Sequence, residues 1–98
     1  MNIGKEYKEK ELMLSVSGRL DTTTAPMLET AVSEAVDTCE SLVLDFAGLE
    51  YISSAGLRVI LKAQKSMASK GNMKLIHVNE TIMEIFEITG FSDILTIE

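Results

Sequence analysis

The sequence predicts an α/β fold with a mixed, mostly parallel sheet of four to five strands and three or more helices, in the order β-β-α-β-α-β-α-β. Two strand-like segments open the chain and are close enough to form a hairpin. After them, short apolar runs alternate with longer segments whose apolar residues recur at helical spacing. The chain has 98 residues and no linker, repeat or low-complexity segment, so we expect one domain over residues 1–98.

The opening hairpin comprises a weak strand and a regular one. Residues 3–7 are rich in charge, which suits a strand at the edge of a sheet. Residues 12–17 alternate at the period of two that is typical of a half-buried strand. Residues 8–10 would form the turn between them, and Gly18 would end or bulge the second strand.

A helix and a central strand follow the hairpin. Thr24 is placed to cap the helix, and Pro26 falls in the first turn, where its missing N–H costs nothing. Apolar side chains recur at helical spacing over residues 28–35. Residues 41–46 (SLVLDF) form an apolar run without alternation, which predicts a central strand covered by helices.

The second helix begins at Ser53 or Ser54 and carries an apolar stripe that includes Leu57 and Ile60. Its opposite face is basic. Gly71 is expected to end it as a C-cap in the left-handed conformation.

The remaining elements are a strand, a helix and a last strand. Residues 73–78 form the strand, and Asn79 caps the helix that follows. Gly90 stops that helix, and residues 94–97 are expected to form the last strand. The inward positions of all these periods predict a core of Leu14, Val16, Leu28, Val32, Val43, Leu44, Leu57, Ile60, Leu75, Ile85 and Phe86.

The charge and the apolar pattern exclude several classes of partner. A formal net charge of −6 disfavours binding to nucleic acid and to an anionic membrane surface. The charged N-terminus does not resemble a signal peptide, and no run approaches the roughly 20 apolar residues of a membrane helix. We therefore expect a cytoplasmic protein. Its single cysteine, Cys39, forms no internal disulfide and is expected to be a small buried hydrophobe.

Signals of enzymatic chemistry are absent from the sequence. His77 is the only histidine, and we interpret it as a structural or surface residue. No nucleophile elbow, P-loop or dinucleotide-binding glycine motif occurs. The sequence therefore predicts neither an enzyme nor a bound metal or cofactor.

Two consecutive serines, Ser53 and Ser54, lie where the second helix begins. A serine in this position is by default an N-cap, and one cap suffices. A phosphate on a hydroxyl in the first turn is favoured, because free N–H groups and the positive end of the helix dipole meet it. The pair therefore allows a cap, a phosphorylation site or both.

Two aspartates follow or end predicted strands. Asp21 comes after the second strand, and Asp45 lies near the expected end of the third. Sites in open α/β sheets gather at the carboxyl ends of strands, so both carboxylates could lie near Ser53 and Ser54. The alternative is turn and cap chemistry for Asp21 and a satisfied polar group at a strand end for Asp45.

Four segments together resemble the STAS domains of anti-sigma factor antagonists. Gly18 to Ala25 (GRLDTTTA) is similar to the family's G-x-L/I-D segment, which precedes a helix. Leu42 to Phe46 and Tyr51 to Leu57 (YISSAGL) resemble its central strand and phosphorylation loop. Ile85 to Phe91 (IFEITGF) is similar to its third helix with the glycine that ends it. The resemblance spans almost the whole chain and keeps the order of the elements.

The resemblance implies a regulator that binds a serine kinase which doubles as an anti-sigma factor. Unphosphorylated, such an antagonist sequesters the kinase and frees the sigma factor. Phosphorylated, it releases the kinase until a serine phosphatase resets it. The resemblance further implies a phosphoprotein without cofactor that is monomeric on its own.

The family's phosphoacceptor lies two places before the glycine, which is Ser54 in this chain. Ser53 stands where the family has an aspartate, and it is an alternative acceptor. Family members also often continue into a further helix beyond the position of Glu98. The predicted partner-binding residues are Asp21, Thr22, Thr23, Asp45, Ser53, Ser54, Gly56 and Arg58.

Two other functions remain open. The chain could be a STAS docking subunit that is never phosphorylated, such as a partner of a transporter ATPase, and Ser53 in place of aspartate favours this. It could also be a receiver-like phosphoacceptor that uses Asp45. That function requires an acidic pair on the first strand, which the sequence does not offer.

Overall fold

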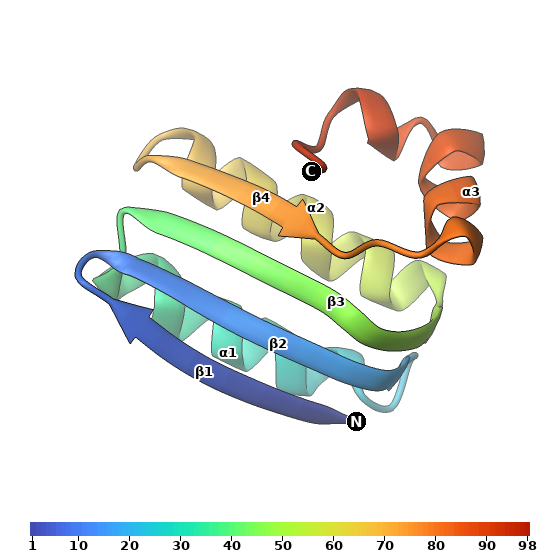
Figure 1. Cartoon of the computed structure of the whole chain (residues 1–98), viewed down its shortest axis with the longest axis horizontal. Coiled ribbons are helices and arrows are strands. Elements are labelled where there is room, and N and C mark those ends of the chain that lie inside the picture. Colours follow the sequence, from blue (N-terminus) through green and yellow to red (C-terminus); the bar gives the residue numbers. More distant parts are fainter.

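A four-stranded sheet with the order β1-β2-β3-β4 forms the centre of the molecule, as the computed structural model of residues 1–98 shows (Figure 1). The elements along the chain are β1 (Asn2–Lys8), β2 (Glu11–Leu20), α1 (Ala25–Thr38), β3 (Ser41–Ile52), α2 (Ser54–Ala68), β4 (Asn72–Ile76), α3 (Glu80–Thr89) and a short 3₁₀ helix, η1 (Phe91–Asp93). The predicted α/β class and the order of the first seven elements are confirmed.

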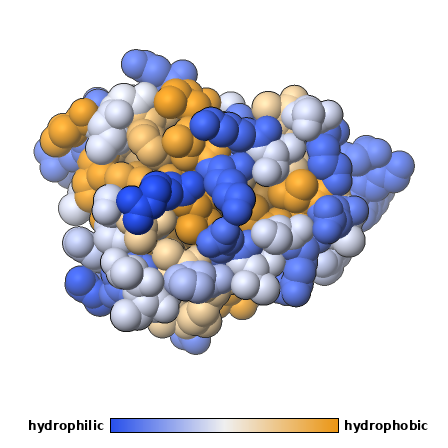
Figure 2. All heavy atoms as spheres, turned by 180° about the vertical axis from the view of Figure 1, so that it is seen from behind, coloured by the Kyte–Doolittle hydropathy of each residue, from blue (hydrophilic) through white to orange (hydrophobic).

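Both crossover helices cover the same face of the sheet. β1 pairs with β2 in antiparallel fashion, whereas β2 with β3 and β3 with β4 pair in parallel. The two crossovers advance in one direction across the sheet, and right-handed crossovers then place α1 and α2 on one side (Figure 1). Figure 2 shows this helical face, where apolar patches lie between hydrophilic side chains. None of the helices combines the length and the apolar character that crossing a membrane requires.

The core lies between the sheet and these helices. All predicted core residues are buried except Ile85, which is half-buried. Val43 is also buried, but it stands apart from the cluster that contains its neighbours Leu42 and Leu44. It points to the opposite face, where Met13 and Lys74 flank it on the adjacent strands. The run is a central strand between β2 and β4, as predicted, and α1 and α2 cover the face that Leu42 and Leu44 line.

β3 is longer than predicted, because it continues from Phe46 to Ile52. The register of its pairing with β2 shifts at two points, one between Ser15 and Ser17 and one after Gly18. Gly18 has a φ of +92° at the second of these points, which confirms the predicted bulge or end. The additional length of β3 moves the end of the strand away from the position that the apolar run suggested.

Gly71 does not adopt the predicted left-handed conformation. α2 ends at Ala68 with Ser69 as its C-cap, and only Gly18 and Gly90 among the glycines have positive φ. A methyl group on Gly71 would instead collide with the carbonyl oxygen of Glu40. The glycine is required for close approach of two backbone segments and not for its dihedral angles.

The predicted last strand over residues 94–97 is wrong. Gly90 ends α3 with a φ of +82°, as expected, but the chain then turns through η1. Only a single bridge, between Leu75 and Ile97, connects the C-terminal segment to the sheet. The turn through η1 leaves too few residues for a longer strand, and the side chain of Ile94 is half exposed.

Cys39 is buried and free, as predicted, and burial raises the pKa of its thiol.

Candidate functional site

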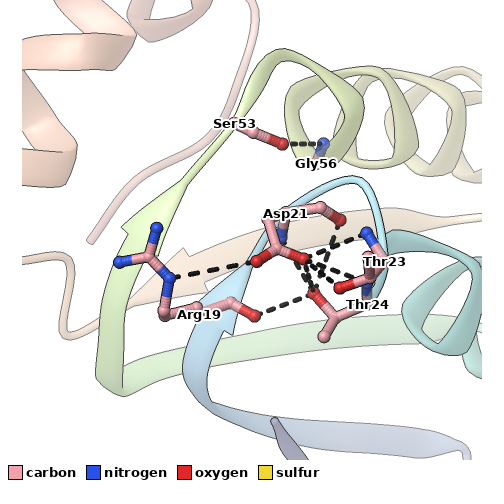
Figure 3. Close-up of polar contacts among 6 residues, drawn as sticks. All are labelled: Arg19, Asp21, Thr23, Thr24, Ser53 and Gly56. Atoms are coloured by element: carbon pink, nitrogen blue, oxygen red, sulfur yellow. Dashed lines mark hydrogen bonds and ion pairs between the residues drawn. The ribbon is translucent and has the colours of Figure 1, made fainter.

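The carboxyl ends of β2 and β3 meet at one end of the sheet, and α2 begins there. Leu20 and Ile52 are paired as the last residues of the two strands. The backbone N–H of Ser53 then donates to the carbonyl oxygen of Leu20 over 2.8 Å. The turn that leads into α1 and the first turn of α2 are therefore held side by side, as Figure 3 shows.

The two serines at the start of α2 have different roles. Ser53 is the N-cap, is partly buried, and its hydroxyl oxygen accepts a hydrogen bond of 3.5 Å from the Gly56 N–H. Ser54 is the first helical residue and is exposed, and its hydroxyl makes no hydrogen bond within the chain. One serine therefore caps the helix, and the other presents a free hydroxyl in the first turn.

Gly56 allows the start of α2 to press against the ends of the strands. A Cβ atom at this position would lie 2.6 Å from Leu20 Cγ and 3.0 Å from Ile52 Cγ1. Since real Cβ atoms do not approach so closely, a larger residue would push the helix away from the sheet. Gly56 is itself buried, so the structure gives it a packing role beneath the serines.

Asp21 organises the turn between β2 and α1. Its Oδ1 accepts hydrogen bonds from the N–H groups of Thr23 and Thr24, over 3.0 and 3.2 Å, and from the Thr23 hydroxyl over 2.7 Å. The Thr23 hydroxyl, together with these N–H groups, stabilises the ionised carboxylate and holds the pKa of Asp21 below its usual value against the opposing effect of desolvation. Thr22 and Thr23 are exposed on the outside of this turn.

Thr24 does not cap α1 with its side chain, contrary to the prediction. Its hydroxyl accepts from the Asp21 N–H over 2.8 Å and donates to the carbonyl oxygen of Arg19 over 2.8 Å. The side chain therefore faces back into the turn. Of the two positions that an N-cap at Thr24 would serve, Pro26 has no N–H, and the Met27 N–H donates to the Thr24 carbonyl oxygen over 2.9 Å.

A pair of exposed side chains beside this turn was not predicted from the sequence. Arg19 and Tyr51 are opposite each other on β2 and β3, and the guanidinium of Arg19 lies 4.2 Å from the centre of the Tyr51 ring. Arg19 Nε is also 3.9 Å from Asp21 Oδ2. The register of β2 on β3 could have revealed this pair, but only if the full length of β3 had been known.

Asp45 lies away from the two serines, contrary to the expectation that both aspartates would gather there. It is paired with Ser15 in the middle of β3, seven residues before Ile52. At about 3.3 Å per residue, this places it on the order of 20 Å from the end of the strand. The expectation fails because β3 does not end after Phe46.

Asp45 instead pairs with His77, whose Nδ1 lies 2.9 Å from Asp45 Oδ1. Burial raises the pKa of Asp45, but the Ala47 N–H and the His77 ring outweigh it and hold the pKa below its usual value. His77 is largely exposed and has a φ of +58° in the turn after β4. No third potential metal ligand joins this pair.

Comparison with known proteins places these features in a family. The model of the STAS domain matches residues 2–98. A protein of Listeria monocytogenes, named anti-sigma-B factor antagonist, is 35% identical over 104 residues, which covers 100% of this chain and 90% of the relative.

Solved structures show the same fold. The crystal structure of an anti-sigma factor antagonist from Mycobacterium paratuberculosis has a TM-score of 0.90 and 24% identity, over 98% of this chain and 83% of that one. The Bacillus cell fate determinant SpoIIAA, in its phosphorylated form, has a TM-score of 0.78 and 17% identity, over 99% and 91% of the two chains. The match to the family model, the relative and the shared architecture lead to one conclusion: the chain belongs to the STAS domain family.

Proposed function

We propose that this chain is an anti-sigma factor antagonist, a binding protein without catalytic activity, and that phosphorylation of Ser54 releases its partner. The names of its relatives support the first part, and the phosphorylated form of SpoIIAA supports the second by analogy. One observation carries the assignment to Ser54: its hydroxyl is exposed and unbonded in the first turn of α2, whereas Ser53 serves as the cap.

A phosphate on Ser54 is compatible with the fold. The first turn of a helix stabilises a nearby anion by about 0.3–1 kcal/mol through its dipole and free N–H groups. A phosphate on Ser53 would displace the N-cap hydrogen bond to Gly56, and the loss of such a cap costs about 0.5–2 kcal/mol. The modification of Ser54 should therefore change the surface and leave the structure in place.

The change in surface charge is what would release the partner. Phosphorylation adds about −1.5 to −2 charges near neutral pH, close to the ionised Asp21 and on a chain whose net charge is already −6. A partner that fits a neutral hydroxyl would have to desolvate this dianion. Such a mismatch costs several kcal/mol, which corresponds to a loss of affinity of about a hundredfold or more.

The partner surface that we propose surrounds the start of α2. The exposed residues at this end of the sheet are Arg19, Thr22, Thr23, Tyr51, Ser54 and Arg58, and Asp21 and Ser53 lie half-buried among them. Asp45 and Gly56 belonged to the predicted set, but Asp45 lies elsewhere on β3 and Gly56 is buried.

The partner that we propose is an anti-sigma factor with serine kinase activity, and a serine phosphatase reverses the modification. We also propose that the chain is a monomer on its own and acts in the cytoplasm.

Phosphosite mapping tests the proposal. The chain is incubated with ATP and the serine kinase encoded near its gene, and the modified residue is identified by mass spectrometry. Wild type and Ser53→Ala should be labelled, and Ser54→Ala should not. Equal labelling of Ser54→Ala and wild type would transfer the role to Ser53. Absence of label on both serines would leave the unmodified docking subunit, for example of a transporter ATPase, as the function.

A further inference from the structure

Three exposed basic side chains lie on α2 or beside its start, and they differ in how their charge is compensated. Arg19 contacts Asp21 and the ring of Tyr51. Lys62 forms a 2.8 Å ion pair with Glu29 across the two helices. Arg58 is exposed and forms neither an ion pair nor a hydrogen bond through its side chain. Its charge is therefore available to an anion that arrives nearby.

Arg58 is well placed to reach Ser54. The two residues are four positions apart in α2, so they lie on the same face of the helix in successive turns. Helical side chains lean toward the N-terminus, which brings the long arginine side chain over the turn that holds Ser54. The arginine also borders a groove of about 390 Å³ between α1 and α2, together with Thr22 and Ala55, so its guanidinium has room to move.

We propose that Arg58 is the intramolecular counter-ion of the phosphate on Ser54, a role that rests on the proposed modification of this serine. The planar guanidinium can donate two parallel hydrogen bonds to phosphate oxygens. Ser54 and Arg58 are both exposed, so rotation of their side chains can bring them together without any movement of the backbone.

This contact has two effects on the switch. It favours the dianion over the monoanion, so that the modified chain carries its full added charge at a lower pH than a free phosphoserine, whose second pKa is about 6. It also withdraws the guanidinium from the partner surface. One modification therefore adds an anion and removes an available cation at the same place.

The experiment is a phosphorus NMR titration of the full chain with phosphoserine inserted at position 54 during translation, which needs no kinase. Relative to wild type, Arg58→Gln should raise the second pKa of the phosphate by at least about 0.2. Lys65→Gln is the matched control, because it removes one exposed charge of the same helix. Lys65 lies roughly 16 Å from Ser54 along the axis, beyond the screening length of about 8 Å at physiological salt. Its effect should be under about 0.1.

Equal shifts in the two variants, or none in Arg58→Gln, would overturn the role of Arg58, provided that the amide spectrum shows both variants folded. The outcome is independent of the kinase assay. If a kinase labels Ser54 and Arg58→Gln leaves the titration unchanged, only this inference fails. If no kinase labels Ser54 and the titration shifts, the proposed function fails and the contact remains a physical property of the modified chain.

Discussion

Position 71 has no room for a side chain, because the carbonyl oxygen of Glu40 occupies the space that a Cβ atom would need. Gly71→Ala should lower the free energy of unfolding by about 1–3 kcal/mol, since the backbone must shift to relieve the collision. Urea denaturation measures this. Gly4→Ala is the control, because its Cβ would meet Ser15 Cβ at an ordinary 3.7 Å. Comparable losses in the two variants would contradict the proposed cause.

Asp21 should make the stability of the fold depend on pH. The hydrogen bonds from the Thr23 hydroxyl and the neighbouring N–H groups hold its pKa in the folded state below the unfolded value of about 3.9. Its contribution is therefore present above about pH 4 and is lost as the pH falls through the folded pKa. Asp21→Asn should be destabilised at pH 7, and the difference from wild type should shrink at pH 3.

Urea denaturation at the two pH values checks this expectation for Asp21. The exposed Glu87 provides a control, because Glu87→Gln also neutralises one carboxylate but on the distant α3. A difference between wild type and Asp21→Asn that grows at low pH would show that the carboxylate does not stabilise the turn.

Single residues were predictable where one local rule acted alone. The helix start at Ser53 or Ser54 and the turn at Asp21 follow from local rules, whereas Ser54 was singled out only by the family resemblance. Asn79 caps α3 as expected through a 2.9 Å hydrogen bond from the Ile82 N–H. Thr24 was not predictable, because its hydroxyl had a competing acceptor at Arg19 that only the folded turn brings near. The contact of Arg19 with Tyr51 joins residues from two strands, so neither segment predicts it alone.

At the scale of elements, β3 connects the sheet, because it pairs with β2 on one side and with β4 on the other. Leu44 is completely buried on its helical side, so Leu44→Ala should cost about 2–5 kcal/mol of unfolding free energy in a denaturant titration. Ile88 is 84% exposed on α3, and Ile88→Ala should change the stability by less than about 0.5 kcal/mol. A loss below about 0.5 kcal/mol for Leu44→Ala would contradict its central position.

The order of the elements was predictable, but the length of β3 and the last strand were not. The apolar run ends at Phe46, and the residues that extend β3 are held by pairing with β2 and not by their own composition. This error alone placed Asp45 at a strand end and beside Ser54. Conversely, residues 94–97 have the composition of a strand but follow η1, and only Ile97 reaches β4.

For the whole molecule, the central expectation concerns binding. Ser54→Asp should fold normally and bind the anti-sigma factor more weakly than wild type, because it places a charge in an interface fitted to a neutral hydroxyl. Ser54→Ala should keep its affinity and resist modification. Isothermal titration calorimetry measures both, with circular dichroism as the check of folding. Equal affinities of Ser54→Asp and wild type would mean that the interface lies elsewhere.

The position of the partner surface can be mapped directly. Amide chemical shifts recorded while the anti-sigma factor is titrated into the labelled chain should change around Thr22, Ser54 and Arg58, because these exposed residues share one end of the sheet. The residues near His77 serve as an internal reference, because His77 pairs with Asp45, which lies seven residues before the end of β3. A footprint confined to α3 would rule out the surface that we propose.

The hydrogen bond from Ser53 to Leu20 joins segments that are distant along the chain, and this has a consequence for biosynthesis. The turn at Asp21 leaves the ribosome long before the start of α2, so the recognition surface is assembled only after β3 has paired with β2. An isolated peptide around Ser54 lacks the Leu20 carbonyl that anchors the helix start. A kinase that recognises the surface we propose should therefore modify folded chains and not nascent or unfolded ones.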